Sequence, residues 1–63
     1  MIRTLKRYVE PDGKEYVELS MDSDDVKPTE HISGGSIVSE TDTGKVYFYD
    51  EDEGDWVEQF SFQ

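Results

Sequence analysis

Hydrophobic and polar residues alternate along five short stretches of the chain. None of these stretches repeats apolar residues at the three-to-four-residue period of an amphipathic helix, and Ala is absent. β-Branched and aromatic residues are frequent, which favours strands over helices. We therefore expect an all-β fold with five strands, which lie at residues 2–9, 14–21, 36–41, 45–50 and 56–62.

Turn residues separate these stretches. In Glu10-Pro11-Asp12-Gly13 the Pro fixes φ and the Gly accepts a positive φ. The sequence therefore predicts a β-hairpin over 2–21, in which Tyr8 and Tyr16 lie close enough to the turn to pair across it. Turns around Gly44 and Gly54 predict a three-stranded antiparallel meander over 36–62. Together, residues 1–63 are expected to form a single small β domain, as a twisted sheet or a partly open barrel.

Residues 22–35 form a long connection without hydrophobic periodicity. They contain four acidic residues, Pro28 and the Gly34-Gly35 pair. A connection of this length is unusual inside a compact domain, and such segments are often functional. Two interpretations stay open for this acidic loop: a short helical turn after Pro28, or a mobile or partner-binding segment.

Aromatic residues occur on both faces of the predicted strand 45–50. Strand alternation places Val46 and Phe48 on one face and Tyr47 and Tyr49 on the other. A sheet with one buried face does not need aromatic residues on both of its faces. Either the N-terminal hairpin or another chain is therefore expected to cover the second face. In strand 56–62 the same alternation places Trp56, Phe60 and Phe62 together.

Eight apolar residues are the expected core: Leu5, Val17, Leu19, Ile37, Val46, Phe48, Trp56 and Phe60. The remaining aromatics exceed what a thin core needs, and they suggest self-association or docking on another protein. The candidate partner-binding residues are Tyr47, Tyr49, Trp56 and Phe62.

Composition limits the function classes. The chain has 63 residues, 33% hydrophobic residues and no Cys, which excludes a disulfide scaffold and a thiolate metal site. No apolar run approaches the ~20 residues that a membrane-spanning helix needs. The net charge is −10, and residues 15–63 carry fourteen acidic and two basic side chains. This charge repels nucleic acid and anionic lipid and favours a basic partner, so we expect a protein partner, no nucleic acid and no membrane.

The candidates for chemistry are few. His31 is the single histidine, and we expect it to be exposed on the acidic loop without a catalytic role. The acidic run from Asp50 to Asp55 fails the EF-hand pattern, because counting from Asp50 places Gly54 at position 5 and Ser61 at position 12. Gly34-Gly35-Ser36 lacks the Lys of a phosphate-binding loop. We therefore expect no enzyme activity, no catalytic or metal-binding residues and no cofactor.

Several phrases of the sequence occur together at characteristic distances. They are Lys27-Pro28-Thr29-Glu30, Gly35-Ser36, the run from Thr41 to Glu51 (TDTGKVYFYDE), and Trp56 shortly after it. In this layout the chain resembles short proteins encoded in the head and tail gene modules of tailed bacteriophages and prophages. The resemblance covers nearly the whole chain. It implies a non-enzymatic structural protein that is made in the host cytoplasm and can be carried in the virion.

Three function hypotheses follow. The first is a phage or prophage structural or accessory protein, virion-associated or decoration-like, that binds a capsid or tail protein and can form a homo-oligomer. The second is an acidic inhibitor that occupies the nucleic-acid-binding groove of a host protein, which the acidic charge motivates. The third is a small carbohydrate-binding module that stacks sugars on Tyr47, Tyr49 and Trp56.

Overall fold

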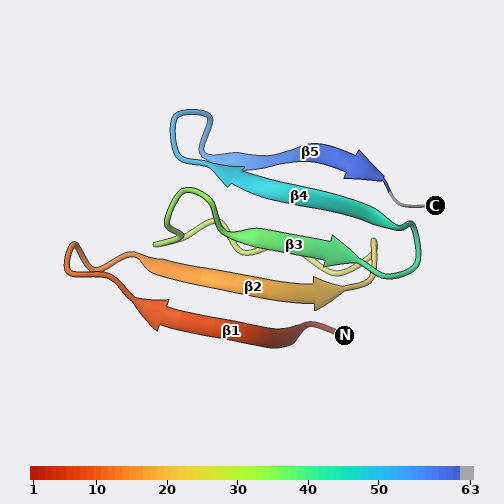
Figure 1. The fold of residues 1–63 in the computed structure, drawn as a ribbon, viewed down its shortest axis with the longest axis horizontal. Helices are drawn as coiled ribbons and strands as arrows, with labels where there is room; N and C mark the ends of the chain where they lie inside the picture. Colours follow the sequence, from red (N-terminus) through yellow and green to blue (C-terminus); the bar gives the residue numbers. More distant parts are fainter. Residues whose placement is uncertain (62–63) are drawn as a thin grey trace.

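A computed structural model describes residues 1–61, which form one five-stranded sheet (Figure 1). The strands are β1 (Arg3–Val9), β2 (Glu15–Met21), β3 (Ile37–Glu40), β4 (Lys45–Asp50) and β5 (Asp55–Ser61). The prediction of an all-β fold is confirmed. Among the described residues, no helix has the length and apolar character required to cross a membrane.

The strands follow chain order across the sheet, but one pair is parallel. β1 pairs antiparallel with β2, β3 with β4, and β4 with β5, whereas β2 and β3 run in the same direction. A parallel pair needs a connection of about a dozen residues or more, and residues 22–36 supply it. This connection, hereafter the crossover, passes behind the sheet in Figure 1 and gives the right-handed arrangement that twisted strands favour. The sheet stays open, with β1 and β5 as its edges.

The crossover covers one face of the sheet. It makes no helical turn after Pro28; its carbonyl groups instead accept hydrogen bonds from side chains of β4 and β5. The Trp56 indole donates to the Pro28 carbonyl at 2.8 Å, and the Tyr49 hydroxyl donates to the Thr29 carbonyl at 3.2 Å. Ile32 is buried and pairs with Glu15 at the start of β2. The acidic loop therefore covers the core.

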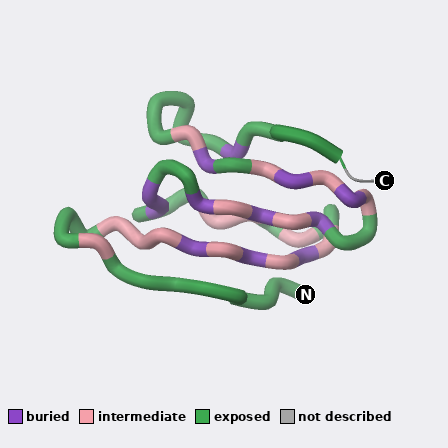
Figure 2. Tube along the Cα trace, in the orientation of Figure 1, coloured by how far each residue is buried: buried purple, intermediate pink, exposed green. Residues whose placement is uncertain are grey.

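The core lies between the sheet and the crossover. Its buried members are Val17, Leu19, Met21, Ile32, Val38, Tyr49 and Trp56. The predicted core is correct for Val17, Leu19 and Trp56, and Val46 is also buried. It is wrong for Leu5, Phe48 and Phe60, which are 60%, 37% and 54% exposed. Phe48 and Phe60 lie on the face that the crossover does not cover. Leu5 lies at the register shift of β1, an edge strand whose residues are all exposed (Figure 2).

A β-bulge in β5 changes which aromatics share a face. Tyr47 pairs with Glu58, but the next residue of β4, Val46, pairs with Phe60, so Gln59 is the extra residue. An extra residue reverses the alternation beyond it. Trp56 therefore faces the core opposite Tyr49, whereas Phe60 lies on the other face beside Val46. The prediction that Trp56 and Phe60 share a face is wrong for this reason, and Phe62 is outside the described residues.

One buried hydroxyl ties the end of the crossover to β2. Ser36 is fully buried, and its Oγ accepts a hydrogen bond from the Val17 backbone N–H at 3.1 Å while it donates to the Ser33 carbonyl at 2.8 Å. Without this hydroxyl, the Val17 N–H would lose its partner inside the protein, which costs about 1–3 kcal/mol. The Gly35-Ser36 step therefore fixes where β3 begins.

Candidate functional site

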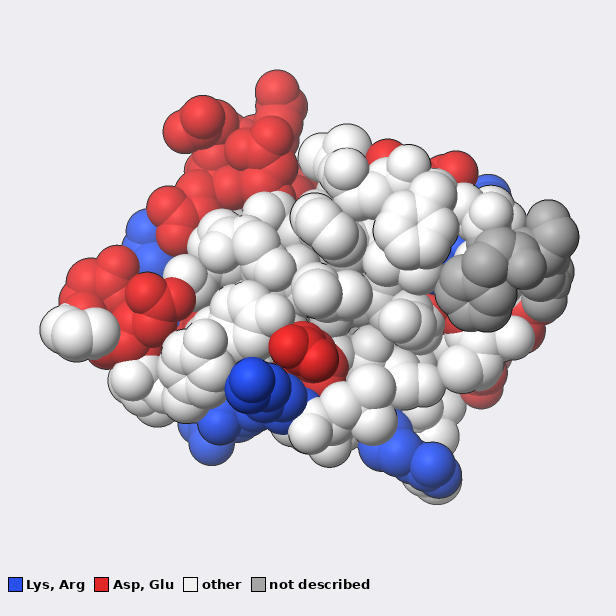
Figure 3. All heavy atoms as spheres, in the orientation of Figure 1, with Lys and Arg blue, Asp and Glu red and all other residues white. Residues whose placement is uncertain are grey.

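The face of the sheet opposite the crossover is the largest surface without a covering segment in the described chain. We call it the open face. It is formed by alternate residues of all five strands: Arg3, Lys6 and Tyr8 of β1, Tyr16, Glu18 and Ser20 of β2, Ile37 and Ser39 of β3, Val46, Phe48 and Asp50 of β4, and Asp55, Val57 and Phe60 of β5. Figure 3 views the molecule from this side and shows a broad area without charged residues over the middle strands.

The apolar part of the open face lies on β4 and β5. Phe48 pairs with Val57, and Val46 with Phe60, so four apolar side chains occupy adjacent positions. Phe48, Val57 and Phe60 are partly exposed, whereas Val46 is buried between them and β3. Exposed apolar side chains that are contiguous, rather than scattered, are typical of surfaces that bind another molecule.

Two tyrosines continue the open face across β1 and β2. Tyr8 and Tyr16 pair across the strands and stack at 5.1 Å between ring centroids, which confirms that they meet beside the first turn. The Tyr16 hydroxyl donates to Glu18 Oε2 at 2.8 Å, and this bond raises the pKa of the Tyr16 phenol. The Lys6 ammonium lies 5.8 Å from the Tyr8 ring centroid. These contacts hold the two rings in place and leave Tyr8 half exposed.

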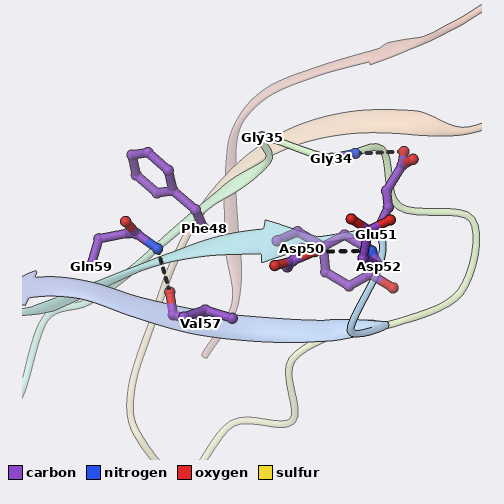
Figure 4. Close-up of a pocket in the computed structure, with 9 residues that line it drawn as sticks. Gly34, Gly35, Phe48, Asp50, Glu51, Asp52, Val57 and Gln59 are labelled. Carbon is purple, nitrogen blue, oxygen red and sulfur yellow. Dashed lines mark hydrogen bonds between the residues drawn. The ribbon is translucent and has the colours of Figure 1, made fainter.

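A shallow hollow of about 440 Å³ lies where the open face reaches the turn between β4 and β5. Its apolar side is formed by Phe48 and Val57, and its rim by the acidic turn and the crossover (Figure 4). Glu51 Oε1 accepts a hydrogen bond from the Gly34 N–H at 2.8 Å, and the Glu51 side chain passes so close that a Cβ at Gly34 would lie 3.1 Å from its Cγ. The hollow suits a side chain with an apolar stem and a positive end.

Acidic side chains gather at the ends of the strands, and the paired residues Asp50 and Asp55 bring two of them to the end of the open face. The turn between β4 and β5 carries Glu51, Asp52, Glu53 and Asp55, and Figure 3 shows this acidic projection at one corner of the face. The basic residues Arg3 and Lys6 lie along the opposite edge, on β1. Away from the turns, Glu18 is the acidic residue that projects from the described strands onto this face.

The predicted partner-binding residues lie mainly on the covered face. Tyr49 and Trp56 are buried and contact each other edge to face at 5.1 Å, so neither ring offers an open surface for stacking. Tyr47 is half buried, with the Lys27 ammonium 4.5 Å from its ring centroid. Phe62 is outside the described residues. The exposed aromatics are instead Phe48 and Phe60, which the sequence assigned to the core.

Two further candidates for chemistry are placed by the structure. His31 is exposed, as predicted, and has a φ of 58° directly before Ile32 pairs with Glu15 of β2. Asp22, Asp24 and Asp25 lie together at the start of the crossover. Two of them bind the N-terminal amine: Asp25 Oδ2 at 2.7 Å and Asp22 Oδ2 at 3.3 Å. The hydrogen bond from the amine lowers the pKa of Asp25.

Comparisons with known proteins give no relative from which a site could be transferred. No protein-family model, curated protein sequence or solved structure matches the chain. Arguments about function therefore depend on the residues and geometry of the chain itself.

Proposed function

We propose that the protein is a non-enzymatic structural or accessory component of a phage or prophage particle, and that it acts by binding other proteins through its open face. The order of residues from Lys27 to Trp56 supports the phage assignment by its resemblance to short proteins of head and tail gene modules. In this proposal residues 2–21 form a hairpin and residues 36–62 a meander, of which residue 62 lies outside the described part of the chain. Their antiparallel strand pairs support that division.

The observation that carries the proposal is the open face itself. A small chain has few large apolar residues, and this one leaves Phe48, Val57, Phe60 and Tyr8 partly exposed on one side of its sheet. Leaving apolar surface in contact with water, rather than burying it, costs roughly 25 cal/mol of free energy for each Å². Retaining these side chains on one face is explained if another protein surface covers them in the functional state.

Mass spectrometry of gradient-purified phage particles tests the proposal. We expect peptides of this chain to be enriched in particles induced from the source strain, relative to the particle-free lysate, at a fixed ratio to a capsid or tail protein. Known virion and cytoplasmic proteins in the same samples serve as controls. Peptides found only in the particle-free lysate would contradict the proposal.

The acidic projection at the turn between β4 and β5 favours a second candidate, an inhibitor that occupies a nucleic-acid-binding groove of a host protein. Glu51, Asp52, Glu53 and Asp55 are all exposed there. Such a complex would depend on charge, so its affinity would fall steeply as salt increases. Capture of a host protein from cell extract at two salt concentrations distinguishes it from the first proposal, in which apolar contacts dominate.

A further inference from the structure

We infer that one end of the open face binds an arginine-bearing segment of a partner protein, and that the arginine side chain enters the hollow beside β4 and β5. The inference rests on the proposed function and adds the chemistry of the partner. The acidic end consists of Asp50, Asp52 and Asp55, and Phe48 and Val57 are the apolar residues next to it. Both the stem and the charged group of an arginine have a counterpart among these residues.

Two carboxylates face each other at this end of the sheet. Asp50 of β4 pairs directly with Asp55 of β5, and Asp52 lies on the turn between them. Like charges directly opposite each other on neighbouring strands are destabilising. Within residues 1–61, every ion pair is made by other carboxylates, so no cation of the described chain lies on these three residues. A cation supplied by a partner would relieve this repulsion.

The hollow joins the acidic end to an apolar surface. Phe48 and Val57 lie on the same face as Asp50 and Asp55, two residues away along each strand, which is a distance of about 7 Å. Figure 4 shows Phe48 on one side of the hollow and Asp50 with Asp52 on the other. A side chain that follows the hollow therefore passes from apolar contacts to carboxylates. Arginine has groups in this order, an aliphatic stem and a terminal guanidinium.

A guanidinium fits these carboxylates better than a metal ion does. Ca²⁺ takes about six to eight oxygen ligands. Asp50 Oδ1 already accepts hydrogen bonds from the backbone N–H groups of Asp52 at 2.9 Å and Glu53 at 3.3 Å, and the neighbouring Phe48 and Val57 supply no oxygen. A guanidinium instead donates to carboxylates that keep their bonds to the chain. It is also weakly hydrated, so it tolerates apolar contacts.

The rest of the apolar surface indicates the sequence of the partner segment. Along β4, the open face carries Val46, Phe48 and Asp50 at two-residue intervals, and Phe60 lies beside Val46. An extended segment that lies over β4 presents its alternate residues at the same spacing. The matching segment therefore has one arginine and apolar residues two and four positions away from it.

NMR titration of the ¹⁵N-labelled full chain with a synthetic peptide tests the inference. The probe is acetyl-Thr-Leu-Thr-Leu-Thr-Arg-Thr-amide, and its control has citrulline in place of arginine, which keeps the shape and removes the charge. We expect amide shifts on β4, β5 and the turn between them, and a dissociation constant of about 1 mM or below. The citrulline peptide should bind about 10-fold more weakly. Absence of binding, equal affinity for the two peptides, or shifts confined to other parts of the chain would each overturn the inference.

The variant Asp50→Asn/Asp55→Asn separates binding from folding. Asn keeps an oxygen that accepts the hydrogen bonds of the turn, and the substitution removes both charges. We expect this variant to bind the arginine peptide about 10-fold more weakly, yet to resist urea at least as well as the natural chain, because the repulsion is lost. Asp24→Asn/Glu30→Gln, at two exposed positions of the crossover, is the matched control and should bind normally. An equal loss in both variants would assign the effect to net charge and overturn the site.

The apolar half of the site is tested by Phe48→Ser/Phe60→Ser. This variant removes the two exposed rings of the face and should weaken binding of the arginine peptide about 10-fold. Val26→Ser is its matched control, because Val26 is 84% exposed on the crossover, and it should leave binding unchanged. Circular dichroism verifies that each variant is folded. Unchanged binding by the folded double variant would overturn the apolar contacts.

Other occupants of the face give different results. Calcium chloride alone, at constant ionic strength, should leave the amide signals of Asp50 and Asp55 unchanged, and saturable shifts there would assign the carboxylates to a metal ion instead. Concentration-dependent shifts of the open face without peptide would assign it to a second copy. Either result overturns the inference. Particle association is measured separately on the natural chain, so a chain that is enriched in particles but does not bind the arginine peptide keeps the proposed function and loses this inference.

Discussion

Replacing Trp56 by alanine is expected to unfold the domain at 25 °C. Trp56 is 8% exposed, packs edge to face on Tyr49, and donates its indole N–H to the Pro28 carbonyl. Removing a buried Trp side chain costs about 3–5 kcal/mol. A domain of this size rarely has more than about 3–5 kcal/mol of net stability. The substitution therefore removes most or all of it, and it also releases the crossover from the sheet.

Urea unfolding followed by far-UV circular dichroism, at one protein concentration, measures this effect. Trp56→Phe keeps an aromatic ring and loses the hydrogen bond, so we expect a smaller loss of about 1–2 kcal/mol. Val26→Ala, at an exposed position of the crossover, should change the free energy of unfolding by less than about 0.5 kcal/mol. A Trp56→Ala chain that unfolds cooperatively at the natural midpoint would show that the crossover does not cover the core.

Replacing Lys27 by methionine is expected to have the second largest effect, because it leaves a buried carboxylate without its ion pair. Glu40 is 3% exposed and accepts a hydrogen bond from the Lys27 ammonium and another from the Thr43 hydroxyl at 2.8 Å. Removing one partner of a buried pair costs about 3–5 kcal/mol. Lys27→Met/Glu40→Gln, which removes both charges, should recover much of this loss.

The pH dependence of stability checks the same pair. The Lys27 hydrogen bond holds the pKa of Glu40 below its ordinary value of 4.5, so the unfolded chain binds a proton more readily than the folded chain. The contribution of the pair is therefore present above pH 4.5 and is lost as the pH falls through the lower folded pKa. In Lys27→Met, protonation of Glu40 relieves the buried charge. The difference in unfolding free energy between the two chains should shrink as the solution is acidified below pH 4.5. A difference that stays constant with pH would contradict the role of the pair.

The strands were predictable because local patterns determine them. Alternating residues and turn signals such as Pro11-Asp12-Gly13 depend on neighbours in sequence, so the positions of β1 and β2 and the pairing of Tyr8 with Tyr16 follow from them. The path of the crossover does not follow, because residues 22–35 have no periodicity. The length of this segment was the sequence feature that could have indicated the parallel pair, because a parallel connection needs about a dozen residues or more.

The candidate site could be predicted only in part. Alternation correctly separates Val46 and Phe48 from Tyr47 and Tyr49, but it does not determine which face the crossover covers. The carbonyls of Pro28 and Thr29 decide this, because they accept hydrogen bonds from Trp56 and Tyr49 and hold these aromatics inside. The bulge at Gln59 then places Phe60 on the open face, and a single-residue insertion in a strand has no clear sequence pattern here.

We propose that the open face is the surface through which the protein enters a particle. The most direct test is quantitative mass spectrometry of purified particles from three strains, which carry the natural chain, Phe48→Ser/Phe60→Ser or Val26→Ser. We predict that the double variant is depleted from particles about 10-fold or more and accumulates, folded, in the particle-free lysate, while Val26→Ser is incorporated normally. Incorporation of the double variant at the natural level would contradict the claim.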